Sequence, residues 1–292
     1  MQNRRVKLLW LSAIACNGNA HSFLNYPNLE QFLKDFSFVY HPILESLYSL
    51  EDIINKQVEC DILLIEGAIS PEFKKANTPI INLISKYANI AKKVITIGTC
   101  ATFGGIFKES GYRFTTGLHF EKEKELFLFS SLKDKTISLS GCPIHPEVLV
   151  STLYAIKEDL ELHLDRFLRP KEFYAYTIHS GCTRNEYFEY KIDNHQFGRL
   201  EGCMFYEHGC QAPFSHGSCN RILWNGVNSK TRNGEPCHGC TEPDFPKQNL
   251  FRTKKNMGVP QFLPLGVSKR AYLTLAGVTK AFKIKRLEED LF

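Results

Sequence analysis

The sequence lacks three features that would assign it at once to a class of protein. It contains no run of 18 apolar residues, so a membrane-spanning helix is not expected. It lacks a strong excess of either charge, because 36 basic residues face 31 acidic ones, and the net charge of +5 does not indicate a nucleic-acid partner. It also lacks internal repeats and low-complexity tracts. With 43% hydrophobic and 12% aromatic residues, a chain of 292 residues is expected to fold into about two domains.

The N-terminus lacks the pattern of a removable export signal. Arg4 and Arg5 precede an apolar stretch, as in twin-arginine signals. However, residues 6–15 are few, include Lys7 and run directly into Cys16 without a small-residue cleavage site. We therefore interpret this stretch as the first strand of a cytoplasmic protein, for which peripheral membrane association stays open.

Cysteine, in contrast, is abundant. Ten cysteines occur, at positions 16, 60, 100, 142, 182, 203, 210, 219, 237 and 240. They are oddly placed for a disulfide scaffold in so large a chain, and in a reducing cytoplasm thiols stay free to bind metal. The sequence therefore predicts cysteine-rich metal sites, with Cys60, at the start of an apolar run, as an ordinary core thiol.

The first 165 residues alternate short β-rich runs with helical stretches, which predicts an α/β fold with a parallel sheet and helices on both faces. Strands are expected at residues 7–13, 38–40, 61–65, 94–97 and 136–139, and helices near residues 23–35, 71–89 and 146–160. After Pro170, residues 178–246 are rich in Cys, Gly, Asn and His, and metal is the available cross-link for such a segment. We therefore expect a domain of residues 1–170 and an irregular domain of residues 171–292.

Three cysteines follow predicted strands. Cys16 follows the first strand, Cys100 the fourth and Cys142 the fifth. In open α/β sheets the carboxyl ends of parallel strands meet at one edge, where ligands bind. These thiols are expected to lie together there and to bind an iron-sulfur cluster, although three unrelated core cysteines remain the alternative.

The fourth ligand position is expected in the loop that holds Cys16, but Asn19 stands where a Cys-x-x-Cys turn would place its second thiolate. Two alternatives follow. Either the Asn19 amide oxygen is a weak neutral ligand of a 4Fe-4S cluster, or the corner iron is absent and the cluster is 3Fe-4S. In the first case, the missing negative charge should raise the reduction potential.

The second half carries seven further candidate ligands. The natural division is four and three: His179, Cys182, Cys203 and Cys210 for one cluster, and Cys219, Cys237 and Cys240 for another. Two zinc sites are the alternative, since His208, His216 or His238 can complete them, and the chain would then be a zinc-binding interaction module.

Together, five motifs resemble the small subunit of NiFe-hydrogenases. The resemblance runs from Lys7 to about Phe245. The motifs are Leu-Trp-Leu at residues 9–11 before Cys16, Ile-Glu-Gly-Ala-Ile at 65–69, Gly-Thr-Cys-Ala-Thr-Phe-Gly-Gly at 98–105, Gly-Cys-Pro at 141–143 and Cys-His-Gly-Cys-Thr-Glu-Pro-Asp-Phe at 237–245.

The resemblance implies a fold and a function. It implies a flavodoxin-like domain that holds a proximal cluster at Cys16, Cys100 and Cys142, with Asn19 in place of the fourth cysteine, followed by an irregular domain. In that second domain His179, Cys182, Cys203 and Cys210 would hold a distal 4Fe-4S cluster, and Cys219, Cys237 and Cys240 a medial 3Fe-4S cluster. The large subunit of such enzymes carries the NiFe centre for H2 ⇌ 2H+ + 2e−, and this chain would relay the electrons to an acceptor, a redox protein or a quinone, that the sequence does not identify.

Two departures from the family pattern carry information. With Asn19 at this position, the sequence resembles the cytosolic uptake branch of the family. The alternative to an uptake enzyme is a regulatory H2-sensing hydrogenase. Six residues separate Cys203 from Cys210, where the family has five, which leaves the fourth distal ligand open.

Three other features carry expectations. Glu66, after the third strand, is a candidate for a proton path or a cap of the following loop. The strand-end loops around Phe103 are expected to form an apolar interface with the partner subunit. Between Phe245 and Leu287 there are ten Lys or Arg and no acidic residue, which indicates either a solvated surface or a docking patch for an acidic partner or a second protomer.

Overall fold

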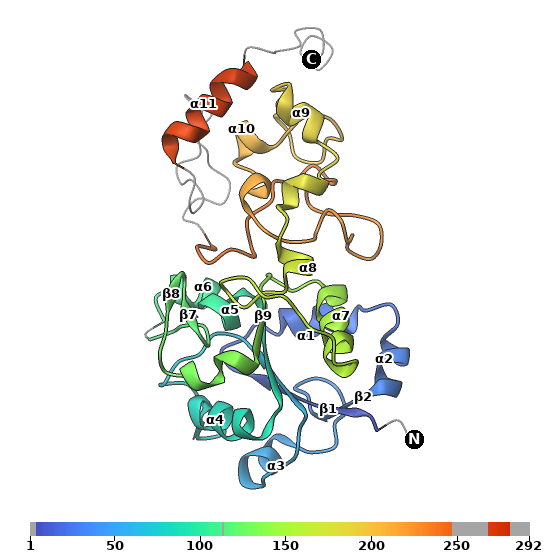
Figure 1. The fold of residues 1–292 in the computed structure, drawn as a ribbon, viewed down its shortest axis with the longest axis vertical. Coiled ribbons are helices and arrows are strands. Elements are labelled where there is room, and N and C mark those ends of the chain that lie inside the picture. Colours follow the sequence, from blue (N-terminus) through green and yellow to red (C-terminus); the bar gives the residue numbers. More distant parts are fainter. Residues whose placement is uncertain (1–3, 113, 247–267, 281–292) are drawn as a thin grey trace. The chain divides into compact units, whose positions relative to one another are not determined.

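The computed structural model describes residues 4–112, 114–246 and 268–280 (Figure 1). The chain forms two compact units. The first comprises Met1–Ala175 together with Cys240–Phe245, and the second comprises Tyr176–Gly239 and Pro246–Phe292. Each unit is described by itself below.

The first unit is built on a five-stranded parallel sheet. Its strands are β1 (Val6–Ser12), β2 (Phe36–Tyr40), β3 (Ile62–Glu66), β6 (Lys93–Ile97) and β9 (Thr136–Leu139), in the spatial order β2-β1-β3-β6-β9. This order is the flavodoxin-like one, with its topological switch between β1 and β3. All residues of β3 and β9 are buried, as expected for strands covered on both faces. The α/β prediction and all five predicted strands are confirmed.

Helices cover both faces of this sheet. Leu9, Leu11, Leu63 and Ile65 pack in one core cluster with residues of α3 (Leu50–Asn55) and α4 (Ile80–Ile90). On the other face Trp10 contacts Phe23 of α1 (Gly18–Leu24), with α2 (Leu29–Asp35) and α7 (Pro146–Lys157) beside it. Short helices α5 (Gly98–Phe103), α6 (Gly105–Glu109) and α8 (Lys171–Tyr174) complete the helical part of this unit, with the 3-10 helix η1 (Ser130–Lys135).

Two predicted helices differ from those observed. The stretch at residues 23–35 forms two helices, α1 and α2, because the sequence Asn-Tyr-Pro-Asn interrupts it. The helix expected near residues 71–89 begins only at Ile80, because β4 (Lys74–Lys75) and β5 (Thr78–Pro79) form a hairpin before it. Ala76 and Asn77 turn this hairpin with φ of 45° and 66°, the backbone conformation of a two-residue turn. A second hairpin pairs β7 (Phe120–Glu121) with β8 (Lys124–Glu125).

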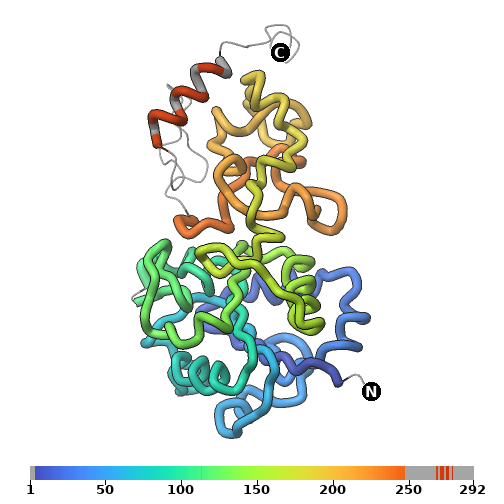
Figure 2. Tube along the Cα trace, in the orientation of Figure 1, coloured from blue at the N-terminus to red at the C-terminus, as the bar shows by residue number. Residues whose placement is uncertain are grey.

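The second unit has little regular structure, as Figure 2 shows in yellow and orange. Between residues 178 and 246 it contains only η2 (Ile178–Gly181), α9 (Asn185–Glu189), α10 (Phe205–His208) and η3 (Ala212–Phe214). Its core consists of aromatic side chains and cysteines, including Phe205, Cys203 and Cys210. In the tail, α11 (Lys269–Lys280) packs Tyr272 against Phe205 and Phe214; most of the basic tail lies outside the described residues. No helix in the described part of the chain is long and apolar enough to cross a membrane.

Candidate metal centres

The three strand-end cysteines lie at the carboxyl edge of the sheet. Cys16 follows β1, Cys100 lies in α5 directly after β6, and Cys142 follows β9. Besides burial, which is the main cause, the nearby Cys16 raises the pKa of the Cys100 thiol electrostatically. The loops after β6 and β9 are joined by the Thr99 amide, which donates to the Gly141 carbonyl at 3.0 Å. Cys16 is exposed and the other two thiols are partly exposed, so all three remain accessible to a cofactor.

The backbone around Cys100 is suited to an anionic sulfur. Burial raises the pKa of the Cys100 thiol, while hydrogen bonds from the backbone amides of Ile106 and Phe107 oppose that rise. A Cβ atom on Gly105 would lie 2.8 Å from the Cys100 sulfur, and Gly105 has a φ of +51°, so only glycine fits here. Amide hydrogen bonds to sulfur stabilise the charge of a cluster ligand, and this environment therefore fits an iron-sulfur site.

Asn19 is held in a buried polar network. Its side-chain oxygen accepts a hydrogen bond from the Ile144 amide at 2.9 Å. Its side-chain nitrogen donates to Glu66 Oε1 at 3.3 Å and to the Ile97 carbonyl at 3.5 Å. A Cβ atom on Gly98 would meet this nitrogen at 2.5 Å, so the loop after β6 approaches Asn19 closely. Asn19 thus ties the loop of Cys16 to the loops that carry Cys100 and Cys142.

Glu66, at the end of β3, is completely buried. Its Oε1 accepts hydrogen bonds from the backbone amides of Asn19, at 3.0 Å, and Ala20, at 3.4 Å, while Oε2 accepts from Trp10 Nε1 at 2.9 Å. The carboxylate therefore satisfies amides in the first turn of α1 and, contrary to what the sequence suggested, caps neither the following loop nor a helix near Pro71.

Four side chains in the second unit surround one cavity. His179, Cys182, Cys203 and Cys210 line one small pocket, together with Arg184 and apolar residues that include Phe188 and Phe205. The extra residue between Cys203 and Cys210 therefore does not remove Cys210 from this set. Three thiols and an imidazole around one cavity are a donor set that fits an iron-sulfur cluster.

Burial and hydrogen bonds set the protonation of the groups around this cavity. Burial raises the pKa of Cys203 above the normal thiol range and that of Cys210 to about 11. Burial lowers the pKa of His179, which keeps the imidazole neutral. The Cys237 amide donates to the Cys210 sulfur at 3.2 Å, and the Arg184 amide donates to the Cys182 sulfur at 3.4 Å. Thiols in such a site lose their protons when a metal takes their place.

The remaining three cysteines are divided between the two units. Cys219 and Cys237 belong to the second unit, where Cys237 is buried. Cys240 begins the segment Cys240–Phe245, which packs with the first unit although the sequence places it within residues 171–292. Ser140 Oγ donates to the Thr241 carbonyl at 2.8 Å, and Arg169 Nη1 donates to the same carbonyl at 3.0 Å. No local pattern in the sequence signals these long-range contacts.

Two further sequence expectations concern individual side chains. Phe103, expected at an interface, is instead fully buried and packs against Phe120 and Phe167, with ring centroids 6.0 and 5.1 Å away. The alternative zinc ligands His208, His216 and His238 do not line the cavity described above. Among the described residues, no three His, Cys, Asp or Glu side chains are arranged to hold a single metal ion.

The chain is similar to known proteins in both sequence and fold. The family model for the C-terminal part of NiFe/NiFeSe hydrogenase small subunits matches residues 174–252, and the model for the 20 kDa subunit of NADH ubiquinone oxidoreductase matches residues 16–156. The periplasmic [NiFe] hydrogenase small subunit 1 of Nitratidesulfovibrio vulgaris is 31% identical over 260 residues, covering 83% of this chain and 80% of the relative.

Other relatives point the same way. The F420 non-reducing hydrogenase II small subunit of Methanosarcina mazei is 29% identical over 287 residues, covering 82% of this chain and 73% of the relative. The solved [NiFeSe]-hydrogenase of Desulfomicrobium baculatum superposes with a TM-score of 0.73 at 25% identity, covering 86% of this chain and 100% of its own. These matches do not favour a zinc-binding interaction module. The chain belongs to the family of NiFe-hydrogenase small subunits.

Proposed function

We propose that this chain is the electron-transferring small subunit of a NiFe-hydrogenase that oxidises H2 to two protons and two electrons. The observation that carries the proposal is the cavity lined by His179, Cys182, Cys203 and Cys210, together with the three cysteines at the sheet edge. Every clustered thiol is then assigned to electron transfer. The reaction at nickel and iron therefore belongs to a large-subunit partner, and no residue of this chain is catalytic.

Three iron-sulfur clusters are proposed along the chain. Cys16, Cys100 and Cys142 hold the proximal cluster with Asn19 beside it, His179, Cys182, Cys203 and Cys210 hold the distal cluster, and Cys219, Cys237 and Cys240 hold the medial cluster. The medial cluster is assigned as 3Fe-4S and the distal one as 4Fe-4S, whereas the proximal one is either 3Fe-4S or a 4Fe-4S cluster with Asn19 as a ligand. When bound, such clusters supply one-electron redox centres whose potentials depend on charge, hydrogen bonds and exposure.

The protein's own groups tune and protect these sites. The amides of Ile106 and Phe107 at Cys100 and of Cys237 at Cys210 donate to sulfur, which stabilises negative charge there. Arg184 lies 3% exposed at the wall of the distal cavity and donates to backbone carbonyls such as that of Gly202, at 2.6 Å. Its fixed positive charge favours an added electron, and the aromatic side chains around it exclude water.

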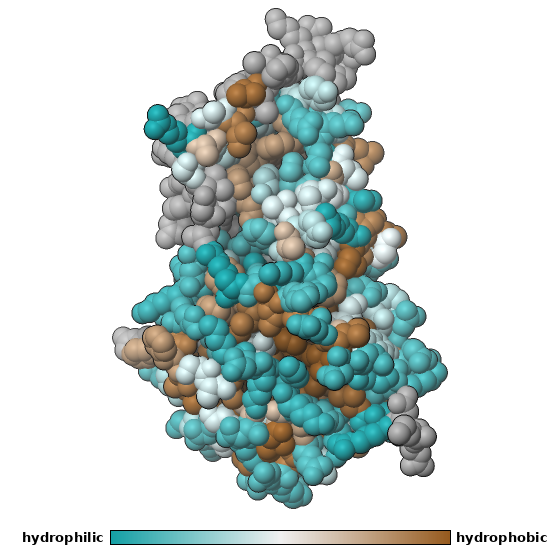
Figure 3. Space-filling model, viewed as in Figure 1, coloured by the Kyte–Doolittle hydropathy of each residue, from teal (hydrophilic) through white to brown (hydrophobic). Residues whose placement is uncertain are grey.

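The branch, compartment and acceptor are also part of the proposal. We place the chain in the cytosolic uptake branch, and hence in the cytoplasm, because Asn19 replaces a proximal cysteine. The basic tail is proposed as the docking region for an acidic redox partner or for a second heterodimer. Exposed apolar side chains of the first unit, such as Phe127 and Leu128, are candidates for contact with the partner subunit. Figure 3 shows one face of this unit, on which hydrophobic residues are brown.

Copurification tests the proposal. The chain should be expressed anaerobically in its native context with an affinity tag, and the bound proteins analysed for nickel, iron and sulfide. We expect a nickel-containing partner and, besides the iron of its NiFe centre, about ten or eleven iron atoms per chain, according to whether the proximal cluster holds three or four. A preparation that contains zinc in place of iron, or that retains no nickel-containing partner, would contradict it. As a control, replacing the core thiol Cys60 by Ala should leave the iron content unchanged.

A further inference from the structure

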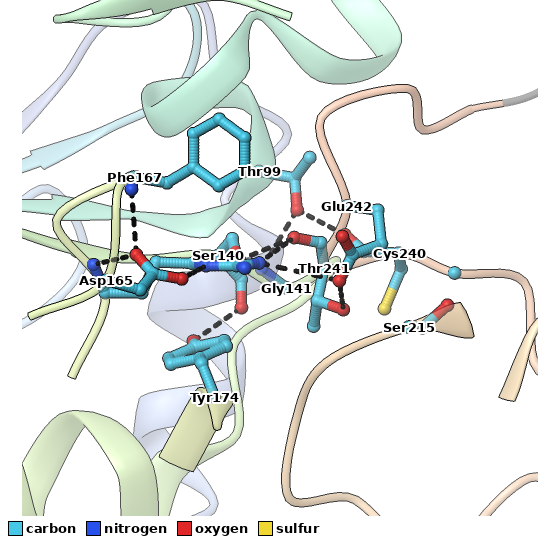
Figure 4. Close-up of polar contacts among 12 residues, drawn as sticks. Thr99, Ser140, Gly141, Asp165, Phe167, Tyr174, Ser215, Cys240, Thr241 and Glu242 are labelled. Atoms are coloured by element: carbon cyan, nitrogen blue, oxygen red, sulfur yellow. Dashed lines mark hydrogen bonds and ion pairs between the residues drawn. The ribbon is translucent and has the colours of Figure 1, made fainter. Parts of the chain in front are cut away.

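One short segment of the second half is anchored beside the strand-end cysteines. Figure 4 shows Cys240, Thr241 and Glu242 held against Thr99, Ser140 and Gly141. The Thr99 hydroxyl donates to the Cys240 carbonyl, and the Ser140 hydroxyl donates to the Thr241 carbonyl. All of these residues belong to the first compact unit, so the contact is internal to it.

The Thr99 hydroxyl has two partners. Besides donating to the Cys240 carbonyl, it accepts a hydrogen bond from the Gly141 amide at 2.9 Å. Thr99 is only 1% exposed, so water does not replace these partners. Thr99 directly precedes Cys100 and Gly141 directly precedes Cys142. One buried hydroxyl therefore joins the backbone beside two proximal cysteines to the backbone of the medial cysteine Cys240.

We infer that Thr99 is a positioning residue that fixes the proximal and medial cysteine segments together and provides the hydrogen-bonded connection for electron transfer between them. The inference rests on the proposed function. In this step one electron is lost at the proximal site and the same electron is gained at the medial site, and no atom is transferred. Nothing beyond the two redox sites is required.

The physical reason is the continuity of the connection. From Cys100 it follows the peptide bond to Thr99, the Thr99 side chain, the hydrogen bond to the Cys240 carbonyl and the Cys240 side chain. Electron tunnelling is faster along covalent and hydrogen bonds than across a gap of equal length. Without the hydroxyl, a gap replaces the hydrogen bond, and two buried polar groups lose their partner.

The test uses the anaerobic complex with the large subunit. Thr99→Val keeps the branched shape without the hydroxyl, and Thr99→Ser keeps the hydroxyl. H2–D+ exchange requires only the NiFe centre, whereas dye reduction by H2 also requires electron transfer through this chain. We expect T99V to reduce the rate of H2-driven benzyl viologen reduction several-fold with unchanged H2–D+ exchange, and T99S to restore it.

A second measurement does not depend on activity. Loss of a buried hydrogen bond should increase hydrogen exchange of residues 240–245 about 5- to 30-fold in T99V. Ser140→Ala is the matched variant, because it removes the neighbouring bond to Thr241 and leaves the Thr99 connection intact. S140A should increase exchange of the segment without slowing dye reduction. Thr152→Val, which removes a buried hydroxyl within α7, should change neither measurement.

Each other outcome rejects the inference. Equal loss of dye reduction in T99V and S140A would show that segment anchoring alone matters. Parallel loss of dye reduction and H2–D+ exchange would show a general structural defect, and wild-type rates in T99V would show that the hydroxyl has no role. If T99V does not assemble, Thr99→Ala is measured in the same way. A wild-type complex without H2–D+ exchange would instead contradict the proposed function, while segment exchange would still report on positioning.

Discussion

At the scale of single residues, Asn19 is the most informative side chain. Its amide group is hydrogen-bonded to the Ile144 amide on one side and to Glu66 on the other. The first contact engages the oxygen that one of the two alternatives uses as an iron ligand, and the second engages the side-chain nitrogen. Together they give Asn19 a structural role that is independent of iron.

Substitution of Asn19 by cysteine tests whether residue 19 lies at the cluster. In Asn19→Cys we expect an all-cysteine 4Fe-4S proximal cluster with a lower reduction potential, because a thiolate adds negative charge. Redox titration followed by electron paramagnetic resonance measures it, since an oxidised 3Fe-4S cluster is paramagnetic. Asn25→Cys, at the end of the same helix, is the control and should leave the spectrum unchanged. An unchanged or higher potential in N19C would show that residue 19 is not at the cluster.

Gly105 provides a second residue-scale prediction. Gly105→Ala should reduce the iron content of the chain, because the new methyl group would lie 2.8 Å from the Cys100 sulfur. Gly111→Ala is the matched control, since Gly111 also has a positive φ, +80°, but has open space around its Cβ position. Both variants should lose about 1–2 kcal/mol of stability from backbone strain, whereas only G105A should lose iron. Equal iron contents would show that this contact does not matter.

Because two histidines are buried, we expect the stability of the chain to depend on pH. Burial lowers the pKa of His41 and of His119 from 6.5 to about 4, and His41 Nδ1 accepts hydrogen bonds from the amides of Ile43 and Leu44. The unfolded chain therefore binds protons that the folded chain does not, between pH 6.5 and about 4. The free energy of unfolding should fall as pH decreases through this window and level off below it.

Urea denaturation at several pH values, followed by fluorescence, measures this effect. His119→Gln should flatten the dependence on pH, whereas His21→Gln, at an exposed position of α1, should leave it as in the wild type. A stability that stays constant between pH 6.5 and 4 would contradict the prediction.

At the scale of elements, the two units differ in what orders them. The first unit has a five-stranded sheet whose strands are almost entirely buried. The longest helix between residues 178 and 246 has five residues, and the core there contains Cys203, Cys210 and Cys237. Helices this short are not stable without tertiary contacts, and the proposed clusters would supply cross-links in the second unit.

Removal of metal should therefore act mainly on the second unit. After anaerobic chelation of the purified chain, we expect residues 178–246 to become sensitive to protease while the sheet of the first unit stays protected. Limited proteolysis with mass spectrometry and circular dichroism measures both. Unchanged resistance of that segment in the metal-free chain would show that packing alone orders it.

At the scale of the whole molecule, the two compact units do not correspond to two consecutive halves of the sequence. Cys240–Phe245 leaves the second half of the sequence and packs with the first unit. Arg169 contributes to this return, through hydrogen bonding to Thr241 and an ion pair with Glu242 at 3.5 Å. Cys240, which we propose as a medial ligand, is thereby held by the same loops that carry Cys100 and Cys142.

The sequence by itself determined the class of the first unit and the place of its cysteines. Apolar runs of strand length, alternating with helical stretches, predict a parallel sheet, and a residue that directly follows a parallel strand necessarily lies at its carboxyl edge. The division of the seven candidate ligands into four and three, in their order along the chain, grouped His179, Cys182, Cys203 and Cys210, which line one cavity. Both conclusions depend on local patterns, which the sequence carries directly.

Only the tertiary structure decided the remaining points. The burial of Phe103 against Phe120 and Phe167, the partners of the Asn19 amide and the return of Cys240 to the first unit all depend on contacts between residues far apart in the chain. The hairpin before α4 depends on positive φ at Ala76 and Asn77. An alanine in the sequence does not predict this conformation, which alanine rarely adopts. Periodicity records which face of an element is apolar, whereas the identity of the segment packed against that face is fixed only when the whole chain has folded.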